Sequence, residues 1–250
     1  MNAISLLKRR KPLFLWLEQR WCGNLFRLQM SNDLELEDST MKNQWVSLIG
    51  ALLFAFSVTA AGQNYVAGED YDVLSPPFRV ANPDKIEVRE FFWYGCGHCF
   101  TFEPLLAAWK QSLSDDVDFQ GSPAIWNGTM KLHAQMFFAA EALGLGDAMH
   151  KAIFQAMHVD RNPLGTKKQI QELFASQGVS SADFDKAFAS FGVNAQIGKA
   201  ESIMRAAKIT GTPELVVNGK YRISTRKAGS QANMLKIANA LIEKERKALN

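Results

Sequence analysis

Cysteine is scarce in this chain, with only three among 250 residues, which excludes a small scaffold held together by several disulfides. The sequence has one CxxC motif, at Cys96 and Cys99, and no paired-histidine motif, so a zinc site would lack two of its four ligands. The formal net charge of +3 is too small to indicate nucleic acid or an anionic membrane surface as a partner. These absences leave one close pair of thiols as the main candidate for chemistry.

Apolar residues are plentiful by contrast, since they make up 47% of the sequence and include 17 phenylalanines. A chain of this length and composition is not disordered and can build a sizeable core in one or two domains. One apolar run, over residues 46–58, is shorter than the stretch of about 20 residues that a transmembrane helix needs.

Residues 41–61 have the parts of a secretory signal peptide: a basic start at Lys42, the apolar run, and then small residues. We expect this segment to direct export and to be cleaved; an uncleaved membrane anchor is the alternative. Residues 1–40 contain no motif, and we interpret them as an upstream extension that is not part of the native protein. The alternative is a cytoplasmic extension. An exported chain with one thiol pair lies in a compartment where disulfides persist.

The CxxC motif is expected at the junction of a strand and a helix. Residues 86–92 predict a strand whose apolar end is typical of a strand buried on both faces, and residues 99–113 carry apolar residues at helical spacing. Tyr71-Asp72-Val73-Leu74 predicts an earlier short strand, and residues 117–120 predict a later one that ends before Gly121-Ser122-Pro123.

Residues 128–208 show helical patterns only, and sheet signals return after them. We expect helices over 130–143, 147–158, 166–177 with Thr166 as N-cap, 181–191 capped by Ser181 and ended by Gly192, and 193–208. Residues 214–217 and 220–224, joined by Asn218-Gly219, predict a hairpin, and residues 231–248 predict a terminal helix. The order predicts an α/β sheet interrupted by a helical insertion.

Cys96 should be the attacking thiol, because a helix N-terminus favours a thiolate, and Cys99, one turn later, should be the buried resolving thiol. An inert structural disulfide and half of a zinc site are the alternatives. His98, between the two thiols, can stabilise the Cys96 thiolate by its charge or by a hydrogen bond. His133, His150 and His158 fall on the helical block, and we interpret them as ordinary surface or packed residues.

Glu90 is a carboxylate next to the apolar end of the strand predicted over 86–92, six residues before Cys96. If it is buried, its pKa is raised and it can relay the proton of the resolving thiol. If it faces an open edge, it is an ordinary solvated glutamate.

The chain resembles the thioredoxin fold and, within it, the DsbA family of bacterial thiol oxidases. The resemblance covers residues 64–250 and is carried by Glu90-Phe91-Phe92, the Cys96-Gly97-His98-Cys99 motif, Gly211-Thr212-Pro213 and residues 216–221. It implies a discontinuous thioredoxin-like domain, residues 64–127 and 209–250, with residues 128–208 as a helical insertion domain.

The resemblance also implies a function and partners. It implies a periplasmic protein that oxidises the cysteines of reduced, unfolded secreted proteins, and a membrane quinone oxidoreductase of the DsbB type that restores its disulfide. Pro213 should be a cis proline that faces the motif, leaving the backbone of Thr212 free to pair with a peptide substrate beside Gly97. No cofactor, metal or nucleic acid is implied, and we expect a monomer.

Three residues depart from the family pattern. Gly97-His98 stands where Pro-His is usual and matches protein disulfide isomerases, while Pro104 resembles thioredoxin. Gly121 stands where related oxidases carry a basic residue beside the buried acid. A disulfide reductase or isomerase therefore remains an alternative, as does a non-catalytic peptide-binding chaperone on the same fold.

Overall fold

A computed structural model of the protein describes residues 64–249. The expected upstream extension (1–40), the expected signal peptide (41–61) and Cys22 lie outside these residues. Among the helices that the structure describes, none combines the length and the apolar character needed to cross a bilayer.

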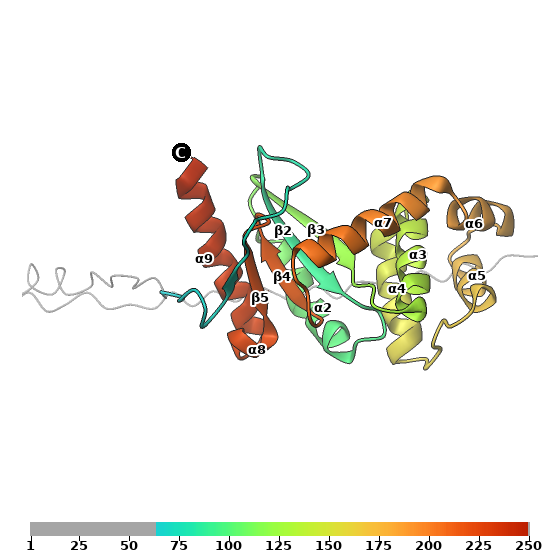
Figure 1. The fold of residues 1–250 in the computed structure, drawn as a ribbon. Helices are drawn as coiled ribbons and strands as arrows, with labels where there is room; N and C mark the ends of the chain where they lie inside the picture. The colour runs from blue at the N-terminus through green and yellow to red at the C-terminus, as the bar shows by residue number, and fades with distance from the viewer. Residues whose placement is uncertain (1–63, 250) are drawn as a thin grey trace, which may run out of the picture. The chain divides into compact units, whose positions relative to one another are not determined.

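A mixed sheet lies at the centre of the described residues (Figure 1). Its strands are β1 (Asp72–Val73), β2 (Ile86–Phe92), β3 (Val117–Pro123), β4 (Glu214–Val217) and β5 (Tyr221–Ser224). They are arranged in the order β1-β5-β4-β2-β3, in which β2 and β3 are parallel and the other pairs antiparallel. Strand β2 is an interior strand, between β4 and β3, and is buried along its whole length, so the turn that follows it starts from a rigid element.

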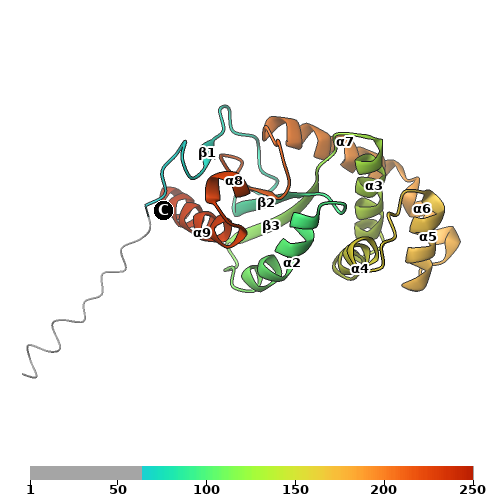
Figure 2. The same ribbon diagram turned by 90° about the horizontal axis from the view of Figure 1, so that it is seen from below.

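Helices cover both faces of the sheet. Helices α2 (Gly97–Lys110) and α9 (Gln231–Leu249) pack on one face, where Val88 and Leu215 share a core with Phe102 and Leu241. Helix α7 (Phe191–Ala206) lies on the opposite side, as Figure 2 shows, and its Met204 belongs to a separate core that includes Phe91 and Val216 of the sheet. The start of α2 therefore lies just beyond the end of the buried strand β2.

The remaining helices lie mostly between β3 and β4. They are α3 (Gly128–Ala142), α4 (Gly146–His158), α5 (Lys167–Ser176) and α6 (Ser181–Phe188), with a short α8 (Thr225–Ala228) after β5. Their apolar side chains form a core that also contains Phe92, Tyr94 and Cys99. The helical block predicted from the sequence therefore shares its core with the thiol motif instead of packing only against itself.

Serine caps set two helix boundaries differently from the sequence-based expectation. Ser180, not Ser181, caps α6 by accepting a hydrogen bond from the amide of Asp183, and α6 ends at Phe188. Ser190 then caps α7, so Gly192 lies inside this helix instead of ending the previous one. Thr166 caps α5 as predicted and forms a reciprocal capping box with Gln169.

Strand β3 is longer than predicted, because its parallel pairing with β2 continues through Gly121, Ser122 and Pro123. The turn residues that suggested an earlier end belong to an edge strand, where a proline need not donate a ladder hydrogen bond. Gly121 consequently pairs with Glu90.

The predicted hairpin joins β4 and β5 through Asn218 and Gly219, with φ values of 49° and 65°. Two successive positive φ angles define the hairpin turn that Asn-Gly favours. A Cβ atom at Gly219 would also overlap the carbonyl of Phe78, so this position requires glycine on two counts.

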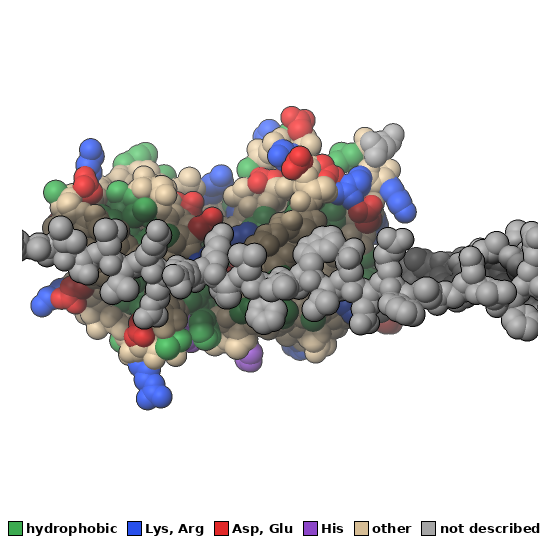
Figure 3. Space-filling model, turned by 180° about the vertical axis from the view of Figure 1, so that it is seen from behind, with side chains coloured by type: hydrophobic (Ala, Val, Ile, Leu, Met, Phe, Trp, Pro, Cys, Tyr) green, Lys and Arg blue, Asp and Glu red, His purple; other side chains and the backbone are tan. Residues whose placement is uncertain are grey.

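The surface carries charges of both signs. On the visible part of the face in Figure 3, basic and acidic side chains are interspersed. Among the described residues, Lys167 pairs with Asp185 at 2.6 Å. This mixed pattern fits the small net charge of the sequence.

Candidate active site

Cys96 lies in the turn between β2 and α2. Its amide donates a hydrogen bond of 2.9 Å to the carbonyl of Trp93, which closes the turn Trp93–Cys96. Cys96 is the N-cap residue of α2, and Cys99 lies in the first turn of that helix. The strand, turn and helix predicted from the sequence thus place one thiol at the helix start and the other beneath it.

The two thiols are free in this structure and differ in exposure, since Cys96 is half-buried and Cys99 fully buried. The pKa of Cys96 is lowered from its ordinary value of 9.0 to about 5, foremost by a hydrogen bond from Cys99. The Thr212 side chain and the backbone amides of Cys99 and His98 lower it further, whereas burial opposes them. Cys96 is therefore a thiolate at neutral pH.

Cys99 has the opposite tendency. Burial raises its pKa first, and its hydrogen bond to Cys96 and the charge of Glu90 raise it further. Cys99 therefore stays protonated at neutral pH and can donate to the Cys96 thiolate. One exposed thiolate and one buried thiol is the arrangement required of an attacking and a resolving cysteine.

The loop before β4 faces Cys96. Its Thr212–Pro213 peptide bond is cis, as the resemblance implied, and the Thr212 carbonyl oxygen lies 3.4 Å from Sγ of Cys96. Only the protonated thiol of Cys96 can donate to that carbonyl, so this contact stabilises the thiol form. The pKa of Cys96 is lowered by the other contacts. The fold thus brings Thr212 to the thiol across 116 residues of sequence.

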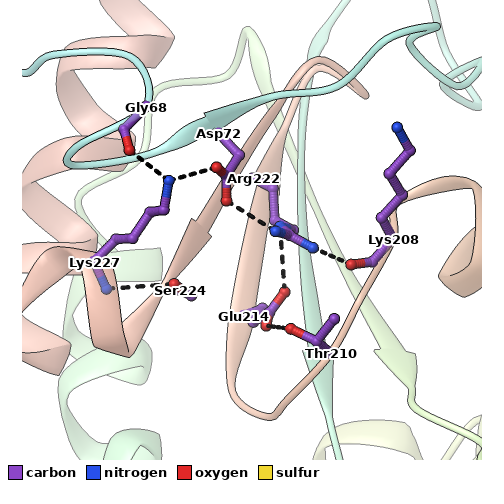
Figure 4. Close-up of polar contacts among 8 residues, drawn as sticks. All are labelled: Gly68, Asp72, Lys208, Thr210, Glu214, Arg222, Ser224 and Lys227. Carbon is purple, nitrogen blue, oxygen red and sulfur yellow. Dashed lines mark hydrogen bonds and ion pairs between the residues drawn. The ribbon is translucent and has the colours of Figure 1, made fainter.

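A buried carboxylate lies at the end of this loop. Glu214 accepts a hydrogen bond of 3.2 Å from the hydroxyl of Thr210, and Nε of Arg222 lies 3.8 Å from its other oxygen. Burial raises the pKa of Glu214, against the charge of Arg222. These contacts join the two ends of the loop Thr210–Glu214 (Figure 4).

Arg222 and Asp72 extend this network toward the sheet edge (Figure 4). The Arg222 guanidinium donates to the carbonyl of Lys208 and pairs with Asp72 at 2.8 Å. Lys227 pairs with the other oxygen of Asp72 at 2.5 Å and donates to the carbonyl of Gly68. Ion pairs among β1, β5 and α8 therefore support the cis-proline loop.

Glu90 is buried, with 2% of its surface exposed, so the alternative of a solvated edge glutamate is wrong. Its Oε1 atom has no hydrogen-bond partner within the described residues. Burial raises its pKa well above the ordinary value, and the charge of Glu103 adds to this, whereas Lys110 opposes it. Gly121 lies beside it on β3, as expected, so the cation that acts on Glu90 comes from α2 instead.

A cleft of about 740 Å³ reaches Glu90 from the β3 side of the molecule. It is lined by Glu103, Lys110, Gly121 and His150, among others. Glu90 itself is among the lining residues, so the cleft extends to the buried carboxylate.

His98 and Gly97 are exposed at the start of α2. Within residues 64–249 the His98 imidazole makes no hydrogen bond or ion pair, while its backbone amide is one of the groups that stabilise the Cys96 thiolate. Gln231 and Thr101 donate to its carbonyl. Nothing lies within 4 Å of a Cβ built on Gly97, which leaves open space beside the thiol.

Glu103 was not predicted from the sequence as a residue near the site, and His133, His150 and His158 were predicted without a role there. Glu103 lies at the fourth position after Cys99, one helical turn on, and this spacing was a signal that could have found it. The three histidines are packed, as one interpretation held, but all three contact Trp93 or Tyr94. Nothing in the sequence pattern marked those contacts.

The part of the chain that the structure describes contains no cluster of three or more His, Cys, Asp or Glu residues placed to hold a metal ion. The arrangement of a half-buried thiolate, a buried thiol and a facing loop supports thiol:disulfide exchange.

Comparison with known proteins points the same way. A family model described as a DSBA-like thioredoxin domain matches residues 115–236, a range that begins after the CxxC motif. The thiol:disulfide interchange protein DsbA of Pseudomonas aeruginosa is 39% identical over 208 residues, which cover 83% of this chain and 99% of that protein. The protein of the same name from Azotobacter vinelandii is 41% identical over 209 residues, with coverage of 80% and 98%.

Solved structures show the same similarity. The crystal structure of Pseudomonas aeruginosa DsbA matches with a TM-score of 0.71 and 42% identity, covering 74% of this chain and 96% of that one. NmDsbA1 from Neisseria meningitidis matches with a TM-score of 0.65 and 26% identity, covering 74% of this chain and 95% of its own.

Proposed function

Because the chain belongs to the DsbA family of thiol:disulfide interchange proteins and is a protein disulfide oxidoreductase, we propose that it donates a Cys96–Cys99 disulfide to reduced, unfolded secreted proteins. The two cysteines are themselves the redox group, and the reaction needs no other cofactor. The protein works as a monomer in the periplasm, without a nucleic-acid partner.

The unequal environment of the two thiols carries this proposal. The lowered pKa of Cys96, about 5, means that the reduced protein holds a stabilised thiolate. A disulfide whose reduced form is stabilised in this way is readily reduced, so it oxidises other thiols. The direction of electron flow is then from the substrate to this protein.

The reaction takes two exchange steps. A substrate thiolate attacks Sγ of Cys96, the Cys96–Cys99 bond breaks, and Cys99 leaves with the electron pair. A second substrate thiolate then attacks the substrate sulfur of the mixed disulfide, and Cys96 leaves as a thiolate. The substrate gains a disulfide and loses two electrons, which the cysteine pair receives.

Glu90 supplies the proton that Cys99 takes up as it leaves. Its raised pKa means that it holds its proton to a higher pH than an exposed glutamate does, and its charge would act on Cys99 once ionised. The cleft on the β3 side gives water a route by which Glu90 regains its proton. Glu90 acts in the step at Cys99, and His98 acts at Cys96 through its amide and an exposed imidazole.

The peptide substrate binds in an extended conformation along the cis-proline loop. The backbone of Thr212 next to Pro213 offers it main-chain hydrogen bonds, and the open space at Gly97 leaves room beside the reacting sulfur. Residues 64–127 and 209–250 form the redox domain, and residues 128–208 form the helical domain packed against it.

A membrane quinone oxidoreductase of the DsbB type reoxidises the cysteine pair, which makes the protein catalytic. Residues 41–61 are a cleaved export signal, and the native chain begins at Met41. N-terminal sequencing of the protein recovered from the periplasm tests the cleavage, since an N-terminus upstream of residue 61 would contradict it. N-terminal sequencing of the uncleaved precursor tests the start, since an N-terminus upstream of residue 41 would contradict it.

The central experiment measures the equilibrium constant of the Cys96–Cys99 pair against glutathione, together with the oxidation of a reduced, unfolded substrate. We expect a reduction potential well above the value of about −270 mV typical of thioredoxin. Cys96→Ser should abolish oxidation, and Cys99→Ser, which cannot form the intramolecular disulfide, should accumulate a mixed disulfide of Cys96 with glutathione when oxidised glutathione is present. Full oxidation by Cys96→Ser would refute the redox function and favour a peptide-binding chaperone.

A reductase or isomerase is the second candidate, because Gly97-His98 is the central dipeptide of protein disulfide isomerases. A potential near or below that of thioredoxin would favour it. Gly97→Pro is the matched variant, since it restores the usual dipeptide and nothing in the structure lies within 4 Å of a Cβ there.

A further inference from the structure

Three of the four histidines in the sequence lie in the helical insertion, and all three contact the turn Trp93–Cys96. His133 comes from α3, and His150 and His158 come from α4. We propose that these histidines are positioning residues that hold the turn where Cys96 is stabilised as a thiolate, and so make the disulfide more oxidising. This inference rests on the proposed function only in taking Cys96 as the reacting sulfur.

His158 contacts the chain on both sides of Cys96. Its Nε2 atom lies 2.7 Å from the carbonyl oxygen of Tyr94, and because a carbonyl only accepts, Nε2 carries the hydrogen. Its ring stacks on Phe100 in α2, with centroids 4.8 Å apart and an interplanar angle of 9°. One side chain thus ties α4 to the turn before Cys96 and to the helix after it.

His150 holds the side chain of the same tyrosine. Its Nδ1 atom lies 3.0 Å from the Tyr94 hydroxyl, and its Nε2 atom lies 3.1 Å from Oε1 of Glu103, at ion-pair distance but without hydrogen-bond alignment. A hydrogen on Nε2 faces the carboxylate favourably, which leaves Nδ1 to accept from the hydroxyl. Phe92 packs edge-on against the His150 ring, with centroids 5.1 Å apart.

His133 holds the first residue of the turn. The indole N–H of Trp93 donates to Nδ1 of His133 at 3.0 Å, and the two rings lie nearly parallel. Burial lowers the pKa of His133, so it is neutral and Nδ1 is free to accept. The Trp93 ring covers Gly95 so closely that a Cβ there would overlap it, which makes the indole position part of the turn geometry.

These contacts affect the two redox forms differently. In the reduced protein, the Cys96 thiolate depends on the amides of His98 and Cys99 and on the Cys99 thiol. A displaced turn would move Sγ away from these donors. The disulfide carries no charge and depends less on them. Loss of a histidine contact should therefore destabilise the reduced form more than the oxidised form.

The experiment compares His158→Leu, which keeps apolar bulk against Phe100 but loses the donor, with His158→Gln, which keeps an N–H group. The pKa of Cys96 is measured from thiolate absorbance, and the equilibrium constant is measured against glutathione. For His158→Leu we expect a higher pKa and a constant shifted about fivefold toward the oxidised protein, the effect of losing one hydrogen bond. His158→Gln should recover most of the shift.

Gln135→Met is the matched control. Gln135 donates to the carbonyl of Phe188 at 2.6 Å, so it makes the same kind of bond within the insertion but does not contact the turn. This variant should lower the stability of the oxidised and reduced proteins equally and leave the pKa of Cys96 unchanged.

The proposal would be overturned if His158→Leu loses equal stability in both redox forms and keeps the wild-type pKa of Cys96 and the wild-type equilibrium constant against glutathione. If that variant does not fold, Tyr94→Phe replaces it, because it removes only the hydroxyl that meets His150; unchanged values would then overturn it. The equilibrium constant of the wild-type protein against glutathione tests the oxidase function separately. The positioning role of the histidines is judged from the difference between the variant and the wild type.

Discussion

Two segments that are far apart in the sequence meet at Cys96, and they are held in different ways. The turn Trp93–Cys96 is held by hydrogen bonds to imidazoles and by packed aromatic rings in a buried core. The loop Thr210–Glu214 is held from behind by carboxylates and basic side chains, with Asp72 and Arg222 at its centre.

The contacts that fix the position of the Cys96 thiol are therefore different from those that fix the loop Thr210–Glu214. Contacts to the turn bear directly on the position of the reacting sulfur, and hence on the pKa of Cys96. The ion pairs behind the loop hold a backbone surface that carries no reacting group. Changes at the turn should therefore distinguish the two redox forms, whereas changes behind the loop should affect both equally.

The largest expected effect is the titration of Cys96 itself. Its pKa should lie near 5, against an ordinary value of 9.0, because the turn places its sulfur among hydrogen-bond donors. Since the folded-state pKa lies below the unfolded one, the thiolate stabilises the reduced protein fully above the unfolded-state pKa. This stabilisation is lost as the pH falls through about 5.

Thiolate absorbance of the reduced protein, followed from pH 4 to 9, measures this midpoint. Unfolding of the reduced and oxidised forms over the same range should show the difference between them shrink toward acid pH. A midpoint above pH 8 would mean that the turn does not stabilise the thiolate.

Gly95→Ala should break the turn most severely, because its Cβ would overlap the indole of Trp93. We expect a loss of about 2–3 kcal/mol in unfolding free energy, as for other overpacked sites. Denaturant unfolding measures the loss, with Gly97→Ala as the control, since nothing lies within 4 Å of its Cβ. Equal stability of the two variants would show that the indole does not confine the turn.

Arg222→Met tests the loop. It removes the ion pair with Asp72 and the hydrogen bond to the Lys208 carbonyl. Loss of charge-assisted bonds in this setting should cost about 2 kcal/mol, equally in both redox forms.

Thermal or denaturant unfolding of each form of Arg222→Met gives the two losses. Lys168→Met, which breaks an exposed pair with Glu172, should change stability by less than about 0.5 kcal/mol. A clear shift in the pKa of Cys96 in Arg222→Met would show that contacts of the loop Thr210–Glu214 also control the thiol, against the distinction drawn between loop and turn.

Glu90→Leu should have the smallest effect, and it should be stabilising. The folded-state pKa of Glu90 lies above its unfolded value, so the wild-type protein loses stability as the pH rises past the unfolded-state pKa of about 4.3. Removing a buried, unsatisfied carboxyl should gain about 1 kcal/mol near pH 8.

The gain of Glu90→Leu should grow between pH 4 and pH 8 in denaturant unfolding, while Glu172→Leu on an exposed helix position should show no such trend. A variant less stable than the wild type at pH 8 would show that Glu90 has a partner in solution.

Local patterns predicted much of the fold. The β2 strand, the hairpin at Asn218-Gly219 and the Thr166 cap follow from interactions within a few residues, and the structure confirms them. The predicted start of α6 was wrong, because Ser180 and Ser181 are both acceptable caps by sequence and only the helix geometry selects Ser180. The predicted boundary between α6 and α7 was also wrong, because Ser190 caps α7 and Gly192 lies inside it.

The burial of Glu90 could not be predicted. Its position in a strand does not say whether a helix covers that face, and α2 does so only in the folded protein. The hydrogen bonds of His133, His150 and His158 join residues 40, 56 and 64 positions away from their partners. A histidine on a helix carries no mark of such a contact.

The sequence alone determined that two thiols stand at the start of a helix after a buried strand, because spacing and local propensity suffice for that. Only the tertiary structure decided which groups surround them: Thr212 facing Cys96, Glu90 covered by α2, and three histidines on one turn. The physical reason is that a thiol's pKa depends on distances of a few ångströms between groups that the chain brings together only by folding.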